Sequence, residues 1–218
     1  MNGIPCGISH FMPSPGLRKF GSTHLMGEPS SSWYNSMAVS TLGSGNLREA
    51  LKLPPGEDKN EWLAVNIIDL VNQVRMVFGV LCEAECTDIK CPSMTAHGRQ
   101  YTWTSDETVL NTSAPQYIDL SLTSCQLNID DENVFPSEIG KQFPANFEER
   151  CQTIMRRLFR IYAHVYFAHV SHFKEIKALP HLNTSFKQFV LFANQFHLLN
   201  KEETEPLREI IENLVSFS

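Results

Sequence analysis

The segment from Asn60 to about Gly79 constrains the fold more than any other part of the sequence. Its apolar residues would cover more than half of the surface of a single helix. They are Trp62, Leu63, Val65, Ile67, Ile68, Leu70, Val71, Val74, Val77 and Phe78. A helix that is apolar on so many sides must be covered by other elements, so we expect it to lie at the centre of the fold.

A second long helix is predicted to begin at Asn146. Asn146 and Glu149 have the spacing of a capping box, in which each side chain accepts a hydrogen bond from the other residue's backbone N–H. The apolar residues that follow recur every three or four positions, as on a buried helix face. They are Phe147, Cys151, Ile154, Leu158, Tyr162 and Val165.

Further helices are predicted from about Pro115 to Asn128, over 184–197 and over 201–216. Residues 100–104 alternate weakly and predict one strand of a small hairpin. Because helices dominate, the sequence favours an all-α fold built as a helical bundle.

Residues 1–38 contain Pro13, Pro15 and Pro29 and many Ser and Gly residues, without the period of a helix or strand. This composition predicts a flexible or variable N-terminal arm. We expect residues 39–218 to form one folded domain, since an apolar fraction of 42% over 218 residues allows a sizeable core.

Charge and cysteine content argue against nucleic-acid-binding, lipid-binding and disulfide-rich proteins. The 18 basic and 24 acidic side chains give a net charge of −6, which argues against a general affinity for nucleic acids or anionic lipids. No apolar run has the length of a signal peptide or a membrane span. Six cysteines are too few for a disulfide framework in a chain of this length. We therefore expect an intracellular protein in a reducing compartment.

Two residue pairs have the spacing of zinc ligands. Four residues separate Cys86 from Cys91, and four separate His164 from His169. Four such ligands suit tetrahedral Zn²⁺ and leave no position for an activated water, so the site would be structural and non-catalytic. Alternatively, the cysteines are core residues and the histidines simply lie on a helix. On an ideal α-helix a five-residue step also places two side chains roughly 140° apart.

Arg156, Arg157 and Arg160 fall within about 100° of arc on the side of their helix opposite the apolar positions. Guanidinium groups on a rigid helix can bind phosphate, because each donates two parallel hydrogen bonds to an oxyanion. The alternative is a solvated helix face.

Acidic side chains gather near the start of the first long helix. Glu57, Asp58, Glu61 and Asp69 lie close to one side of it, beside Trp62. They could meet a basic helix of a partner protein. The alternative is that these carboxylates complement the helix dipole and that Trp62 belongs to the core.

Several segments, in order, resemble the Mob (Mps-one-binder) family. They are Thr-Leu-Gly-Ser-Gly-Asn-Leu-Arg at 41–48, Leu-Pro-Pro-Gly-Glu-Asp-Lys-Asn-Glu-Trp at 53–62, Ser-Ala-Pro-Gln-Tyr at 113–117, Leu-Phe-Arg-Ile-Tyr-Ala-His at 158–164 and His-Leu-Asn-Thr-Ser-Phe at 181–186. The resemblance covers residues 40–216 and implies a four-helix bundle core with extra helices, a small β-hairpin and a structural zinc site. Its zinc ligands fall on Cys86, Cys91, His164 and His169.

The resemblance also implies a function. Mob proteins are non-catalytic co-activators and scaffolds of nuclear-Dbf-related and large-tumour-suppressor kinases in Hippo and mitotic-exit signalling. The implied kinase surface comprises Glu57, Asp58, Glu61, Trp62 and Asp69. The implied pocket for phosphorylated peptides of Ste-twenty-like kinases or scaffolds comprises Arg156, Arg157 and Arg160. Thr41 matches a regulatory phosphorylation site.

The chain departs from the family pattern at three places. Residues 1–38 match no part of the usual N-terminus. Residues 104–113 lack the lysines that help activating members to hold phosphate, which predicts weaker phosphopeptide affinity. Glu85 stands where an aromatic residue usually precedes the first zinc cysteine.

Three other functions remain as alternatives. A phosphopeptide-binding scaffold would bind peptides without activating a kinase. A zinc hydrolase needs three protein ligands and a carboxylate base, and the fourth ligand argues against it. A nucleic-acid-binding zinc finger is disfavoured because Cys91 and His164 lie 164 − 91 = 73 positions apart.

Overall fold

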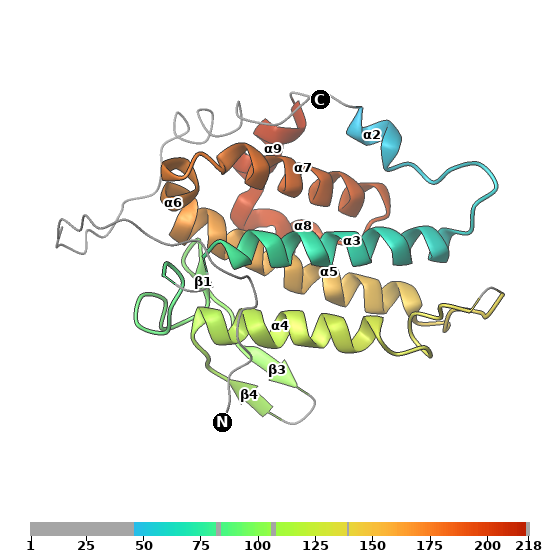
Figure 1. The fold of residues 1–218 in the computed structure, drawn as a ribbon, viewed down its shortest axis with the longest axis horizontal. Helices are drawn as coiled ribbons and strands as arrows, with labels where there is room; N and C mark the ends of the chain where they lie inside the picture. Colours follow the sequence, from blue (N-terminus) through green and yellow to red (C-terminus); the bar gives the residue numbers. More distant parts are fainter. Residues whose placement is uncertain (1–45, 82–83, 106–107, 139, 217–218) are drawn as a thin grey trace, which may run out of the picture.

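The computed structural model describes residues 46–81, 84–105, 108–138 and 140–216. The fold is mainly helical, as predicted (Figure 1). The predicted arm at 1–38 and Thr41 lie outside the described residues. Within the described ranges, no helix has the length and apolar content needed to cross a membrane.

Helix α3 (Lys59–Gly79) occupies the centre of the fold, as its apolar pattern predicts. It contacts α4 (Ala114–Ile129), α5 (Phe147–His164) and α7 (Leu179–Gln195), and it runs between α7 and the α4–α5 pair (Figure 1). Its most buried side chains are Leu63, Ile67, Leu70, Val71 and Val74. Burying each of them stabilises the fold by about 1.5–3 kcal/mol, so α3 organises the core.

Helix α3 begins at Asp58, whose side chain accepts hydrogen bonds from the backbone N–H groups of Asn60 and Glu61 at 2.8 and 3.1 Å. The carboxylate satisfies two donors that a helix start leaves unpaired. Asp58 therefore fixes the position at which the central helix starts.

The predicted capping box at the start of α5 is wrong. The helix does begin after Asn146, but the Asn146 side chain makes no capping hydrogen bond. Its backbone has φ −95° and ψ 18°, because a turn in which Phe147 N–H donates to Pro144 O leads directly into the helix. A capping side chain needs an extended backbone at that position. The motif occurs instead at α8 (Lys201–Thr204), where Asn200 and Glu203 form both of its hydrogen bonds.

Helix α5 continues without a break into a π-helical turn, η1 (Val165–His169), and then into α6 (Val170–Glu175). The π turn has hydrogen bonds between residues i and i+5, one residue more than an α-helical turn. The sequence pattern gave no sign of this turn, because its residues are mostly apolar and buried like those of α5.

The predicted hairpin at 100–104 is only partly correct, because the described residues form two hairpins. In the first, β1 (Thr95–Ala96) pairs with β2 (Arg99–Gln100) through a tight turn with positive φ at His97 and Gly98. Two consecutive positive φ angles are typical of two-residue hairpin turns. In the second, β3 (Trp103–Ser105) pairs with β4 (Thr108–Leu110), with Trp103 opposite Leu110.

The C-terminal helices differ from prediction at their ends. Helix α7 begins at Leu179, five residues before the predicted start, with Pro180 in its first turn, where a missing N–H costs nothing. The predicted helix at 201–216 is divided into α8, a 3₁₀ turn η2 (Glu205–Leu207) and α9 (Arg208–Ser216). Pro206 lies in that turn and lacks the N–H that a continuous α-helix requires. Upstream, the short helix α2 (Leu47–Ala50) packs on α7.

Candidate metal centre and partner-binding surfaces

The structure brings together the four predicted metal ligands, Cys86, Cys91, His164 and His169. All four are buried, and their ligand atoms lie within 4.8 Å of one another. The Cys86 Sγ to His164 Nε2 and Cys91 Sγ to His169 Nε2 distances are both 3.5 Å. The two Nε2 atoms lie 3.2 Å apart.

The π turn explains how His164 and His169 meet. In an α-helix they would point roughly 140° apart. The turn η1 lies between them and accommodates one extra residue, so His169 occupies approximately the place that an i+4 residue has in an α-helix. Their ring centroids are 5.0 Å apart. The objection to the five-residue spacing therefore disappears.

The arrangement fits zinc. Tetrahedral zinc with Zn–S near 2.3 Å and Zn–N near 2.05 Å requires S···N edges of about 3.6 Å and an N···N edge of about 3.4 Å. The distances of 3.5 and 3.2 Å between these atoms agree with both edges. His164 Nδ1 lies 2.9 Å from the backbone oxygen of Thr95. Such a contact orients a ligating imidazole and leaves Nε2 for the metal.

Burial prepares the ligands for a cation. It lowers the pKa of His164 below its ordinary value, and together with the neighbouring His164 ring it lowers the pKa of His169 to about 4. Both imidazoles are thus neutral near pH 7 and present a lone pair. Burial raises the pKa of the Cys91 thiol, so a cation is needed to stabilise its thiolate.

The three predicted phosphate-binding arginines lie on α5, all half-buried, and this rules out a fully solvated face. Arg157 donates to Ser124 Oγ, and its guanidinium carbon lies 4.6 Å from the centre of the Trp103 ring. Arg160 donates to the Tyr117 hydroxyl at 2.7 Å and lies 5.2 Å from the centre of the Tyr101 ring. These neutral groups orient both guanidiniums without cancelling their charge.

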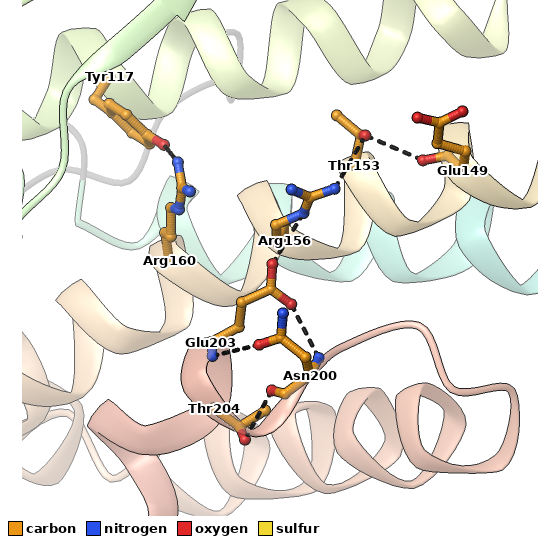
Figure 2. Close-up of polar contacts among 8 residues, drawn as sticks. All are labelled: Tyr117, Glu149, Thr153, Arg156, Arg160, Asn200, Glu203 and Thr204. Carbon is orange, nitrogen blue, oxygen red and sulfur yellow. Dashed lines mark hydrogen bonds and ion pairs between the residues drawn. The ribbon is translucent and has the colours of Figure 1, made fainter.

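Arg156 differs from the other two because it contacts a carboxylate. Its Nε lies 3.0 Å from Glu203 Oε1 at the start of α8, and its Nη2 lies 3.5 Å from Thr153 Oγ1. Figure 2 shows the Glu203 side chain extending from α8 toward Arg156, and Arg160 directed toward Tyr117 on α4. The three arginines therefore have different kinds of partner, a carboxylate for Arg156 and neutral groups for the other two.

The predicted acidic surface lies at the start of α3. Glu57, Glu61 and Asp69 are exposed. Asp58 is exposed too, although it also caps the helix. Trp62 is half-buried, and its Nε1 donates to Leu51 O at 3.3 Å, so this side chain anchors the preceding loop.

Comparison with known proteins decides the family. The sequence profile of the Mob1/phocein family matches residues 39–207, which is more than half of the chain. The chain belongs to the Mob1/phocein family. It is 47% identical over 180 residues to MOB kinase activator-like 1A of Arabidopsis thaliana, covering 81% of this chain and 83% of that protein. It is also 47% identical over 182 residues to MOB kinase activator-like 1 homolog A of Dictyostelium discoideum, covering 82% and 85%. The resemblance inferred from the sequence is confirmed.

This Mob1/phocein chain has a groove that the sequence did not predict. The groove holds about 580 Å³, is largely apolar and lies between α3 and the α6–α7 segment. Its lining includes Asp69, Met76, Val80, Phe173 and Leu182. Beside it on α3, Val65 and Met76 are 62% and 66% exposed. The helical pattern assigned Val65 to the core, so periodicity alone concealed this surface.

The departure from the Mob pattern at Glu85 has a local explanation in the metal-binding loop. Glu85 Oε1 lies 3.4 Å from Lys90 Nζ, and Lys90 also donates to Ala84 O at 2.7 Å. The ion pair spans the loop that carries both cysteine ligands. Glu85 and Lys90 thus form a polar contact across the loop that contains Cys86.

Proposed function

We propose that the chain is a non-catalytic adaptor that activates protein kinases of the nuclear-Dbf-related and large-tumour-suppressor type by binding their N-terminal regulatory region. The observation that carries this proposal is the exposed acidic surface on α3 in a chain whose relatives are named kinase activators. Across the described ranges, no Lys or Arg side chain forms an ion pair with Glu57, Asp58, Glu61 or Asp69. These carboxylates are therefore available to a basic partner.

The surface of α3 suits an amphipathic helix. At 100° per residue, positions 61, 65, 69, 76 and 80 fall within one arc of about 100°. Along the arc, exposed Val65 lies between the carboxylates Glu61 and Asp69, and exposed Met76 and Val80 follow in the lining of the apolar groove. A partner helix with basic residues at one end and apolar residues at the other would bury both parts. Such a helix is the expected form of the kinase regulatory segment.

The metal in this proposal is a structural zinc ion held by Cys86, Cys91, His164 and His169. When bound, it supplies a cross-link between the loop after α3 and the α5–η1 helix, which are distant in sequence. The four protein donors saturate a tetrahedral ion, and this supports a non-catalytic role over a zinc hydrolase.

The same adaptor is proposed to dock phosphorylated Ste-twenty-like kinases or scaffolds through Arg156, Arg157 and Arg160, linking it to Hippo and mitotic-exit signalling. Arg157 and Arg160 support this role, because they are preoriented by neutral partners and keep their full charge. A phosphopeptide-binding scaffold that activates no kinase is the second candidate, supported by the same two arginines.

Replacing Arg157 and Arg160 together by Ala is expected to weaken binding of a phosphothreonine peptide at least tenfold, since each lost charged hydrogen bond is worth about 1.5–3 kcal/mol. Fluorescence anisotropy with a labelled peptide measures the effect. Exposed Arg208, which pairs with Glu205 on the C-terminal segment, provides the control in an Arg208→Ala variant. Equal binding of the unphosphorylated peptide by the wild-type chain would refute phosphate docking.

Two further parts of the proposal concern regulation and location. Phosphorylation of Thr41 would add about −1.5 to −2 charge, and we propose that this added charge alters kinase binding. A Thr41→Ala chain whose kinase affinity still responds to phosphorylation in the same way would remove this idea.

We place the protein in the cytoplasm and nucleus, and imaging of a tagged full chain that finds it in neither compartment would contradict that.

A further inference from the structure

The three arginines of the proposed phosphate site are not electrostatically equivalent. Arg157 and Arg160 are held by hydroxyl groups and aromatic rings. Among the described ion pairs, only Arg156 of these three has a carboxylate partner, Glu203. The Arg156 and Glu203 side chains are 41% and 21% exposed, so this pair is partly shielded from water.

The Glu203 carboxylate is fixed in place by the start of α8. Its Oε2 accepts a hydrogen bond from Asn200 N–H at 3.0 Å, while Asn200 Oδ1 accepts from Glu203 N–H at 2.8 Å (Figure 2). Its other oxygen, Oε1, faces Arg156 Nε. Both carboxylate oxygens are thus engaged, one by the helix cap and one by the arginine. The helix cap therefore holds the Glu203 carboxylate in one geometry beside Arg156, unlike an ion pair between two flexible surface side chains.

A carboxylate at this distance cancels much of the guanidinium charge that an approaching phosphate would feel. It also repels the phosphate itself, which carries about −1.5 to −2 charge at pH 7. Resting on the phosphopeptide docking proposed above, we propose that Glu203 is an intramolecular competitor that lowers the affinity of the arginine site for phosphorylated peptides by pairing with Arg156.

This arrangement affects which partners bind. A carboxylate of an acidic peptide has the same charge as Glu203, so replacing Glu203 at Arg156 adds little binding energy. The peptide also loses translational entropy on binding, whereas Glu203 is already part of the chain. A phosphate has more charge and three acceptor oxygens, so it can share or displace the pair. Glu203 therefore raises the discrimination between phosphorylated and merely acidic peptides.

The test is a Glu203→Gln variant, which keeps the shape of the side chain and removes its charge. Fluorescence anisotropy with the labelled phosphothreonine peptide should show affinity raised roughly three- to tenfold at low salt, and less at high salt, because salt screens the charges involved. Adding Arg156→Ala should remove the part of the gain that comes from the freed guanidinium, so Arg156→Ala should cost more affinity in the Glu203→Gln chain than in the wild type.

Two matched controls isolate the carboxylate. Glu202→Gln changes the net charge equally at the adjacent, exposed position, and Asn200→Ala disrupts the same helix cap while leaving the Glu203 charge beside Arg156. Neither should reproduce the gain. Two results would overturn this inference and leave phosphate docking intact. In the first, the wild-type chain binds the phosphopeptide and Glu203→Gln leaves that affinity unchanged or lowers it. In the second, either control raises the affinity as much as Glu203→Gln does. Failure of both the wild-type and Glu203→Gln chains to prefer the phosphorylated peptide would overturn phosphate docking as well.

Discussion

Replacing Cys86 by Ser is expected to abolish stoichiometric zinc binding and to lower the melting temperature by roughly 10 °C, as for a loss of several kcal/mol in a domain of this size. The reason is the long separation of the ligands along the chain. The cysteines lie in the loop after α3, and the histidines lie at the end of α5 and the end of η1, so the metal would join two segments that are distant in the sequence. Three remaining buried ligands bind zinc far more weakly than four.

Cys125→Ser is the matched control for this change. Cys125, like Cys86, is fully buried, but it lies on α4, outside the metal cluster. Its replacement should cost stability through burial of a hydroxyl and leave one zinc ion per chain. A chelator should lower the melting temperature of the Cys125→Ser chain and leave that of Cys86→Ser unchanged. Metal analysis and thermal unfolding measure these effects, and a Cys86→Ser chain that retains one tightly bound zinc would contradict the assigned site.

Replacing Glu61 and Asp69 together by Lys is expected to weaken binding of a kinase N-terminal regulatory segment by about a hundredfold or more, because attraction to a basic helix becomes repulsion at two points. Both side chains are exposed, so the fold should survive. The structural cost is confined to the dipole contribution of Glu61 in the first turn and to hydrogen bonds between Asp69 and two glutamines. Isothermal titration with the purified segment measures the loss.

The control is a double variant with the same change in net charge, Asp119→Lys with Glu209→Lys. These residues are exposed on α4 and α9, away from the acidic face of α3. Binding should fall by severalfold at most, through the long-range field alone. If both double variants lost affinity equally, overall charge would explain the binding and the assigned surface would be wrong.

Local patterns predicted the helices that have regular faces. The existence of α3 and α4 follows from apolar periodicity, and the predicted ends of both lie within about one residue of the observed ones. Residue spacing alone did not predict where a capping box forms, because the motif also depends on the backbone angles of its first residue. Asn146 with Glu149 and Asn200 with Glu203 have identical spacing, yet only the second pair forms a capping box, because Asn200 is extended and Asn146 is not.

The candidate site was predictable in its ligands but not in its geometry. The cysteine and histidine pairs follow from spacing and family resemblance, whereas the π turn that lets His164 meet His169 depends on how η1 packs. The partner of Arg156 lies 47 positions along the chain, since 203 − 156 = 47, and no local pattern connects them. Exposed Val65 looks like a core residue in the sequence, because a periodic pattern does not show where neighbouring helices stop covering α3.

The central claim, that this chain activates a kinase through the kinase's N-terminal regulatory region, is tested most directly by one activity measurement. The wild-type chain is titrated into a purified nuclear-Dbf-related kinase, and phosphorylation of a substrate peptide is compared between the full kinase and one lacking its N-terminal regulatory segment. The account predicts that activity rises and saturates for the full kinase and stays flat for the truncated one. No rise with the full kinase, or an equal rise with both, would contradict it.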